Sequence, residues 1–427
     1  MIDYRIGDTR DVIASIPDGS VSLVACSPPF IALRSYLPAD HPDKHREIGS
    51  EPDPATFLDT LLALTAEWGR VLAPWGSIAI ELGDTYAGSG GGGGDYLDGG
   101  MRAGQQQFAG SAASMRESNA AHWRAKNQAK SAWPLPKCLA LAPQAYALSL
   151  AYGRNVLNGN PSPAGQWLVR NMIVWHRPNP AVGALGDKFR PSTSYIIVAT
   201  RSPKRWFDLT AVRTAPTADP AKYDGNGYGY RSPKEKGNAT VAMPGNAAGA
   251  PPLDCWDDHE TWTITTQPSK LAHYAMWPPR LAERLVLSMC PEWVCNTCNK
   301  PRRRIEVETS TRVASETDAG KDRIQGRSIG GAFVKAHLVK NAERATAGWI
   351  DCGCGDTWTP GVVLDPFAGT GTTLAVADLH GRDSIGIDID ARNRDLLPAR
   401  INEVRKSLTG MRPPMEGQMA IDFGVSP

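Results

Sequence analysis

Apolar runs and amphipathic repeats alternate along the chain and predict an α/β fold. Short apolar runs bounded by turn residues are typical of buried strands, whereas apolar residues three and four positions apart are typical of helices. The predicted strands are residues 4–7, 21–26, 76–82, 168–175, 194–199, 362–364 and 384–388. The predicted helices are residues 9–15, 53–72, 139–152 and 372–379, with another around Leu281. This alternation favours a sheet covered by helices.

Residues 362–373 combine a short strand, a glycine-rich turn and the start of a helix. Asp365 ends the strand, and Gly369 and Gly371 then allow a tight turn with close backbone approach to a ligand. The free N–H groups at the helix start favour a polar or anionic ligand. The turn contains no lysine, so it does not match a phosphate loop for nucleoside triphosphates. A second strand ends about 20 residues later at Asp388, where the ribose diol of an adenosine would be held.

The strand 21–26 leads directly into a second motif, Ser27-Pro28-Pro29-Phe30. Two consecutive prolines fix the backbone and remove two N–H donors. The carbonyls of Ser27 and Pro28 are then left as acceptors, with an aromatic ring beside them. Such a clamp suits an exocyclic amino group on a flat base. A proline-rich turn is the alternative for this motif alone, but its combination with the Asp365 loop favours the clamp.

Together the two motifs resemble the S-adenosylmethionine-dependent amino-methyltransferases of DNA. The catalytic tetrapeptide of that family, Ser/Asp/Asn-Pro-Pro-Phe/Tyr/Trp, is matched by Ser27–Phe30, and its cofactor loop, Asp-Pro-Phe-x-Gly-x-Gly-Thr-Thr, by Asp365–Thr373. The tetrapeptide precedes the cofactor loop, which is the order of the beta class. The resemblance implies a Rossmann-like, seven-stranded methyltransferase sheet of circularly permuted order. Strand 362–364 is expected at its centre, next to strand 21–26 on one side and strand 384–388 on the other.

The resemblance also implies a set of site residues. The catalytic residues it implies are Ser27, Pro28, Pro29 and Phe30. The cofactor-binding residues it implies are Asp8, Asp365, Pro366, Phe367, Ala368, Gly369, Thr370, Gly371, Thr372 and Asp388. For Asp8 the alternative is a cap on the helix 9–15. The sulfonium methyl group is already activated, so no nucleophilic cysteine is needed, and we expect Cys26 to pack in its strand.

The expected activity is site-specific methylation of double-stranded DNA at the amine of a flipped-out base. Ser-Pro-Pro is more usual in the family for cytosine N4 and Asp-Pro-Pro for adenine N6, so Ser27 favours cytosine N4 and leaves adenine N6 as the alternative. A non-catalytic DNA-binding protein with a methyltransferase fold is a rival hypothesis, against which the two intact motifs argue. Methylation of RNA or of protein amides is a third.

Four of the eight cysteines have the spacing of a metal site. Cys295 and Cys298 form a Cys-x2-Cys knuckle, and Cys352 and Cys354 follow about 50 residues later. Four thiolates from two tight turns fit tetrahedral zinc. The alternatives are four free thiols or two disulfides. Methyl transfer needs no metal, so the zinc would be structural and would hold together the ends of an insertion.

Composition and charge add two further regions that suit nucleic acid. Residues 102–137 carry six basic residues and one acid after a glycine run, and residues 211–260 interleave tyrosines with lysines and arginines. We predict a flexible basic insertion in the first and the target-recognition region in the second. The net charge of +2 over 427 residues neither demands nor excludes a nucleic-acid partner. The absence of an apolar run of about 18 residues and of a signal-peptide pattern predicts a cytoplasmic protein with no membrane partner.

The motifs divide the chain into eight predicted segments. They are 1–84 (catalytic half), 85–137 (Gly-rich basic insertion), 138–210 (remaining sheet), 211–260 (target recognition), 261–290 (cofactor-side helix), 291–358 (zinc insertion), 359–410 (cofactor half) and 411–427 (tail). In the tail, Gln418–Phe423 faintly resembles a peptide that binds bacterial sliding clamps, with an unspecialised tail as the alternative. A homodimer is left open.

Overall fold

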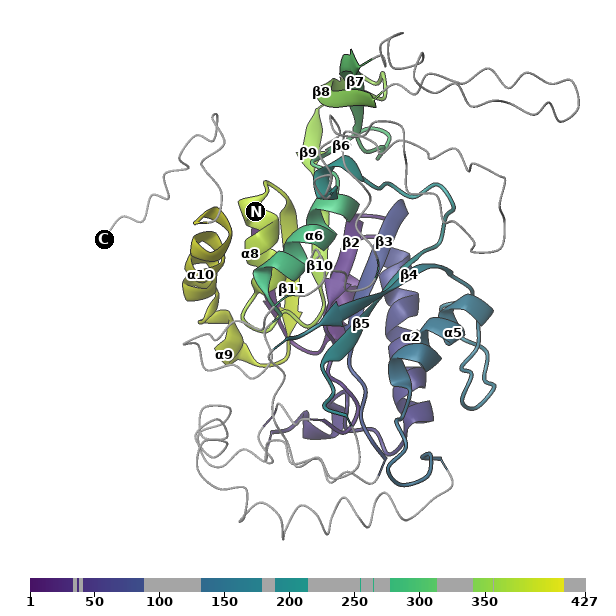
Figure 1. The fold of residues 1–427 in the computed structure, drawn as a ribbon. Coiled ribbons are helices and arrows are strands. Elements are labelled where there is room, and N and C mark those ends of the chain that lie inside the picture. Colours follow the sequence, from purple (N-terminus) through teal and green to yellow (C-terminus); the bar gives the residue numbers. More distant parts are fainter. Residues whose placement is uncertain are drawn as a thin grey trace, which may run out of the picture. The chain divides into compact units, whose positions relative to one another are not determined.

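A seven-stranded mixed sheet forms the framework of the computed structural model (Figure 1). Its order is β1-β11-β10-β2-β3-β5-β4. The strands are β1 (Ile2–Ile6), β2 (Val21–Cys26), β3 (Leu72–Leu82), β4 (Leu168–His176), β5 (Thr193–Thr200), β10 (Val362–Asp365) and β11 (Asp383–Asp388). Neighbours from β1 to β3 are parallel, whereas β5 is antiparallel to both β3 and β4. The predicted seven-stranded sheet is therefore confirmed, with β10 between β11 and β2.

The structure describes most of the sheet and parts of the predicted insertions. The described residues are 1–33, 37, 41–87, 132–178, 189–213, 254, 264, 277–312, 341–355 and 357–410. Most of the predicted basic insertion and target-recognition region, and the whole tail with Gln418–Phe423, lie outside them. The chain divides into two compact units, one of residues 1–207, 253–301 and 356–427 and one of residues 208–252 and 302–355.

The central strands are apolar because both faces of the sheet are covered. All six residues of β2 are buried. Val24 and Cys26 face one apolar cluster, while Leu23 and Ala25 face another. The expected packing role of Cys26 agrees with its full burial in this strand.

Helices cover the two faces of the sheet (Figure 1). On one face lie α2 (Pro54–Val71) and α5 (Ala142–Tyr152), and on the other lie α6 (Pro279–Met289), α8 (Thr372–Leu379) and α10 (Leu397–Thr409). The shorter helical turns are α1 (Thr9–Val12), η1 (Ile13–Ser15), η2 (Lys44–Arg46), η3 (Thr210–Val212) and α9 (Ala391–Arg394). Among the described residues, no helix has the length and apolarity needed to cross a membrane.

The helix α2 begins and ends where its sequence predicts. The Asp53 carboxylate accepts a hydrogen bond from the N–H of Thr56 at 2.9 Å, which satisfies one free donor of the first turn. After α2 the structure differs from our expectation, because β3 starts at Leu72 and not at Gly76. Leu72 already has an extended backbone, and Pro74 cannot continue a helix. The chain therefore passes from helix to strand without a loop.

Two small ladders complete the described structure. In the first unit β6 (Trp293–Cys295) pairs antiparallel with β9 (Trp358–Pro360). In the second unit β7 (Arg303–Arg312) pairs antiparallel with β8 (Asn341–Ile350). Within that second unit, Arg304 forms an ion pair with Asp208 at 2.7 Å and lies over the ring of Trp349.

Candidate active site

The two sequence motifs meet at the carboxyl ends of two neighbouring strands. β10 pairs with β2 through Val363 with Leu23 and Leu364 with Val24, so Asp365 and Ser27 leave the sheet side by side. The order of strands along the chain reverses at this point, where open α/β sheets bind their ligands. A small, partly open cavity lies here. Its lining consists of Ser27, Trp277, Asp365, Phe367, Ala368, Gly369, Thr370 and Thr372.

The glycine-rich loop is held in shape by two carboxylates. Asp365 accepts hydrogen bonds from the N–H of Phe367 at 3.1 Å and from the hydroxyl of Thr373 at 2.6 Å. Asp388, at the end of β11, accepts one from the N–H of Gly369 at 2.8 Å. Gly369 has a φ of 52° and Gly371 a φ of 85°, which glycine adopts without strain. The loop conformation is therefore fixed before any ligand binds.

The charges of the loop favour a cationic ligand. Burial, with a smaller contribution from the nearby Asp388, raises the pKa of Asp365 to about 7. Burial likewise raises the pKa of Asp388 to about 6. Neither carboxyl group forms an ion pair with any residue that the structure describes. A positive charge in the cavity would stabilise both ionised acids.

Three further side chains shape this half of the cavity. The hydroxyl of Thr370 is buried without a hydrogen-bond partner, so it is available to a ligand. Tyr4 donates from its hydroxyl to the carbonyl of Gly369 at 2.5 Å and ties β1 to the loop. Trp277 donates from Nε1 to Thr373 Oγ1 at 3.2 Å. Sequence reasoning placed Trp277 in the cofactor-side segment 261–290 without naming it as a site residue. It did not select Tyr4, because nothing at that position indicates its distant partner.

The Ser27–Phe30 clamp forms the other half of the site. The carbonyls of Ser27 and Pro28 accept no hydrogen bond from any described residue, so both are free to bind a donor. The ring of Phe30 lies against Gly83, where a Cβ atom would come within 2.6 Å of the ring. Glycine just after β3 therefore leaves the room that this ring occupies.

A buried acid, Glu81, lies behind the clamp. The Ser27 hydroxyl donates to Glu81 Oε2 at 2.5 Å, and Glu81 is only 3% exposed. Burial raises the pKa of Glu81, whereas Ser194, Ser27 and Arg177 act in the opposite direction. Sequence analysis missed Glu81, although an acid within the apolar run of β3 was a signal that could have identified it.

Asp8 is not among the residues that line the cavity, although the preceding Gly7 donates its N–H to the carbonyl of Asp388 at 2.9 Å. Its carboxylate caps α1 through the N–H of Arg10 at 2.9 Å and forms ion pairs with Arg10 and Arg46. These contacts correspond to the capping alternative. A role of Asp8 in cofactor binding stays a prediction.

The four cysteines of the predicted metal site form the one group of candidate metal ligands in the described part of the chain. They are Cys295, Cys298, Cys352 and Cys354, and their sulfur atoms all lie within 4.8 Å of one another. Cys295 stands at the end of β6, and the next residue, Asn296, donates its N–H to the carbonyl of Thr357 at 3.1 Å.

A family model described as DNA methylase, of the N6/N4 methyltransferase type, matches residues 21–293 and 357–397. The chain belongs to this family. It is the amino-methyltransferase family that the Ser27–Phe30 and Asp365–Thr373 motifs resemble, so that prediction is confirmed.

Similar proteins include several type II methyltransferases. M.XycI of Xanthomonas campestris pv. cyanopsidis is 26% identical over 64% of this chain and 68% of that protein. M.Cfr9I of Citrobacter freundii is 23% identical over 66% of this chain and 70% of that protein. M.SfiI of Streptomyces fimbriatus is 25% identical, and the match spans 49% of this chain but only 38% of that protein. Among solved structures, PvuII DNA methyltransferase (cytosine-N4-specific) has a TM-score of 0.46 at 12% identity, covering 96% of this chain and 93% of that one.

Proposed function

We propose that the protein is a site-specific DNA methyltransferase that uses S-adenosylmethionine and acts on the exocyclic amine of a flipped-out base, with cytosine N4 as the favoured acceptor. The observation that carries this proposal is a single cavity that joins the Ser27 clamp to the Asp365 loop. An amine acceptor and a methyl donor need such a shared space, because transfer requires both groups in line and in contact.

The cofactor half of the cavity fits S-adenosylmethionine by its chemistry. When bound, this cofactor supplies a methyl group that is already activated on a positively charged sulfur. Among the described residues, Asp365 and Asp388 have no partner cation, and the buried Thr370 hydroxyl has no hydrogen-bond partner. We assign Asp388 to the ribose and the loop residues from Asp365 to Thr372 to the remaining contacts. The role of Asp8 in cofactor binding is to be tested by measuring the affinity for S-adenosylmethionine.

The clamp would hold the amine and remove its proton. The free carbonyls of Ser27 and Pro28 would accept the two amine hydrogens, and Phe30 would stack on the base. When nitrogen gains a methyl group it must lose a proton, and the Ser27 hydroxyl with Glu81 behind it offers a route for that proton. The raised pKa of Glu81 suits it for receiving one. Cytosine N4 is favoured over adenine N6 because the clamp begins with Ser27.

The test is methylation of unmodified bacterial DNA by the purified protein, followed by mass spectrometry of the nucleosides. N4-methylcytosine is expected, and N6-methyladenine would overturn the choice of base while keeping the mechanism. Ser27→Ala and Glu81→Gln should each lower kcat by about 100-fold without changing the affinity for S-adenosylmethionine. Ser20→Ala, an exposed serine that bonds only to Pro17, is the matched control.

Two outcomes would move the function elsewhere. Tight binding of DNA without any methyl transfer would support the non-catalytic DNA-binding hypothesis. Methyl transfer to RNA or to protein amides, but not to DNA, would support the hypothesis that the protein methylates one of those substrates. Recognition of double-stranded DNA is assigned to residues 211–260, so a chimera with this segment exchanged for that of a relative should change the methylated sequence and not the methylated atom.

We also propose that Cys295, Cys298, Cys352 and Cys354 bind one structural zinc ion. Four sulfurs at about 2.3 Å from a tetrahedral zinc would lie roughly 3.8 Å from one another, which the 4.8 Å limit accommodates. The tight turns also support the proposal. Asn299 after the first pair has a φ of 52°, and Gly353 and Gly355 in the second pair have φ values of 82° and 68°. These turns let closely spaced thiolates point toward one ion.

A further inference from the structure

The β4–β5 hairpin and its flanks carry a strong excess of positive charge. Between residues 153 and 207 there is one acid, Asp187. The basic residues of this range are Arg154, Arg170, Arg177, Lys188, Arg190, Arg201, Lys204 and Arg205. The whole chain has a net charge of only +2, so the excess is concentrated at one end of the sheet. A local concentration of this kind indicates an anionic partner more directly than the net charge does.

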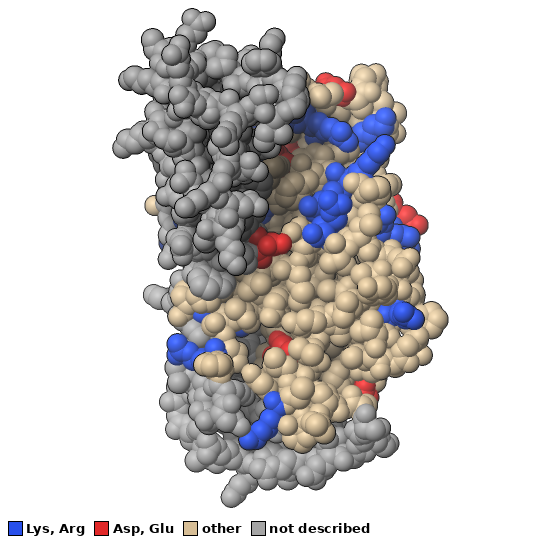
Figure 2. All heavy atoms as spheres, turned by 45° about the vertical axis from the view of Figure 1, so that its right-hand side comes forward, with Lys and Arg blue, Asp and Glu red and all other residues tan. Residues whose placement is uncertain are grey.

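Four of these residues, which we call the basic patch, lie near the start of β4 and just after the end of β5. These ends of the two strands are the ones farther from the active site. They are Arg170, Arg201, Lys204 and Arg205. Thr200 at the end of β5 donates to the carbonyl of Gly76, six residues before the end of β3 at Leu82. Six residues of strand span about 20 Å, so the end of β5 that precedes Arg201, Lys204 and Arg205 lies about that far from the end of β3 at Leu82. Arg170 stands at the register shift of β4 beside Val198 and Ala199 of β5. Figure 2 looks toward this side of the molecule and shows Lys and Arg side chains grouped in its upper part.

Among the described residues, no carboxylate forms an ion pair with a side chain of the basic patch. Arg170 and Lys204 are exposed, and their side chains form no hydrogen bond or ion pair with any residue that the structure describes. Within the described part of the chain, the Arg201 side chain forms one long hydrogen bond, from Nη1 to the carbonyl of Gly69 at 3.4 Å. Exposed lysines and arginines without partners are common singly, but here they surround one that is half-buried.

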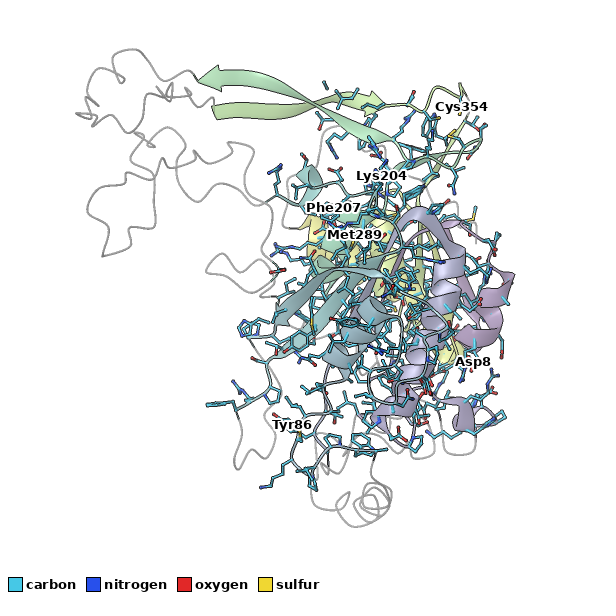
Figure 3. The ribbon with its side chains drawn as sticks, turned by 90° about the vertical axis from the view of Figure 1, so that its right-hand side faces the viewer. Asp8, Tyr86, Lys204, Phe207, Met289 and Cys354 are labelled. Carbon is cyan, nitrogen blue, oxygen red and sulfur yellow. The ribbon has the colours of Figure 1, made fainter. Side chains whose placement is uncertain are left out.

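That half-buried residue is Arg205. Its guanidinium lies 4.4 Å from the centre of the Phe207 ring, and Nη1 is 3.8 Å from the sulfur of Met289. Figure 3 shows Phe207, Met289 and Lys204 close together. Burial and the charge of Arg170 lower the pKa of Arg205 to about 10. A cation that is removed from water without a carboxylate costs free energy, which a bound anion would offset.

We propose that the basic patch binds the phosphate backbone of DNA outside the segment whose base enters the active site. This inference rests on the proposed function, because it takes DNA to be the substrate. Phosphates are favoured over a protein carboxylate because several cations follow one another along the edge, as the regularly spaced charges of a nucleic-acid strand require. The contact would be independent of sequence and would add affinity only when the DNA extends beyond the recognition site.

The test compares the full-length protein with the Arg170→Gln/Lys204→Gln variant on duplexes of about 14 and about 60 base pairs. On the long duplex the variant should bind about tenfold more weakly at low salt, and the slope of log K against log salt should fall by about 1 to 2. On the short duplex its affinity and methylation rate should match the wild type. Lys406→Gln, which removes an exposed lysine on α10, is the matched control.

A second variant separates binding from folding. Arg205→Met keeps the packing on Phe207 and Met289 but removes the unpaired charge, so Tm should rise while the affinity for long DNA falls. An unchanged salt slope in the double variant, or a lowered Tm in Arg205→Met, would overturn the proposal. A wild-type protein that binds long DNA with the expected slope but methylates nothing would contradict the proposed function alone.

Discussion

At the scale of single residues, the site depends on three buried acids. Asp365 and Asp388 hold the loop through N–H and hydroxyl donors, and Glu81 holds Ser27. Each gains hydrogen bonds, yet burial still raises each pKa. The buried acids therefore lower the free energy of unfolding of the free protein at neutral pH, and they make the cavity attractive to positive charge. Such destabilising groups are common at functional sites.

Replacement of Asp365 by asparagine should flatten the pH dependence of stability. The folded state holds the Asp365 proton up to about pH 7, whereas the unfolded chain loses it near 3.8. Its contribution to stability is therefore complete below the lower pKa and is lost as the pH rises through the higher one. Three pKa units correspond to at most about 4 kcal/mol. Urea unfolding of cofactor-free protein between about pH 5 and 8 should show a smaller loss in Asp365→Asn than in wild type. Equal losses in both proteins would contradict the assignment.

At the scale of elements, the site is a junction of strands that are neighbours in space and remote in sequence. β1 and β11 flank each other, and Tyr4 of β1 reaches the loop that follows β10. The helix α6 carries Trp277 just before its start, and Trp277 contacts Thr373 at the beginning of α8. The loop is thus braced from both sides by elements that do not contain either motif.

Tyr4→Phe should weaken cofactor binding without affecting the fold. The substitution removes the hydrogen bond to the Gly369 carbonyl and leaves the ring in place. The loss of one such bond is worth about 0.5 to 1.5 kcal/mol, so Kd for S-adenosylmethionine measured by calorimetry should rise about two- to tenfold. Tyr152→Phe on α5, where the tyrosine is 59% exposed, is the matched control. An unchanged Kd for Tyr4→Phe would mean that the loop holds its shape without β1.

Most of the sheet and both motifs could be predicted from sequence, because their signals are local. Uninterrupted apolar runs predicted β2 and β10, and the Asp53 cap together with the apolar stripe of the following residues predicted α2. Glu81, Tyr4 and Trp277 could not be selected in the same way. Their importance comes from partners brought together by strand register and helix packing, and this information is not present at the positions themselves.

At the scale of the whole molecule, the sheet unit is interrupted by an insertion that leaves after β6 and returns before β9. The ladder between these two strands closes the insertion at its base. The four cysteines stand beside that ladder. A metal ion there would link the ends of the insertion independently of what happens within it.

Removal of zinc should therefore destabilise the protein and leave the chemistry of the cavity unchanged. Elemental analysis should find about one zinc per chain, and a strong chelator or Cys298→Ser should lower Tm by more than about 5 °C. Cofactor affinity at low temperature should be unaffected, because no cavity residue is a zinc ligand. Cys138→Ser, at an exposed cysteine outside the group, is the control. A metal-free protein with an unchanged Tm would show that the four thiols are free.

The central place of β10 also determines when the protein can acquire its fold during synthesis. β2 leaves the ribosome before its neighbour β10, which follows about 340 residues later and takes roughly 20 to 70 s at about 5 to 20 residues per second. Until then β2 keeps one open edge and β1 has no partner, since β1 pairs only with β11. A nascent chain therefore carries a finished clamp without a cofactor loop. Methylation is withheld from every incomplete chain, and such chains are expected to depend on chaperones until the last strands arrive.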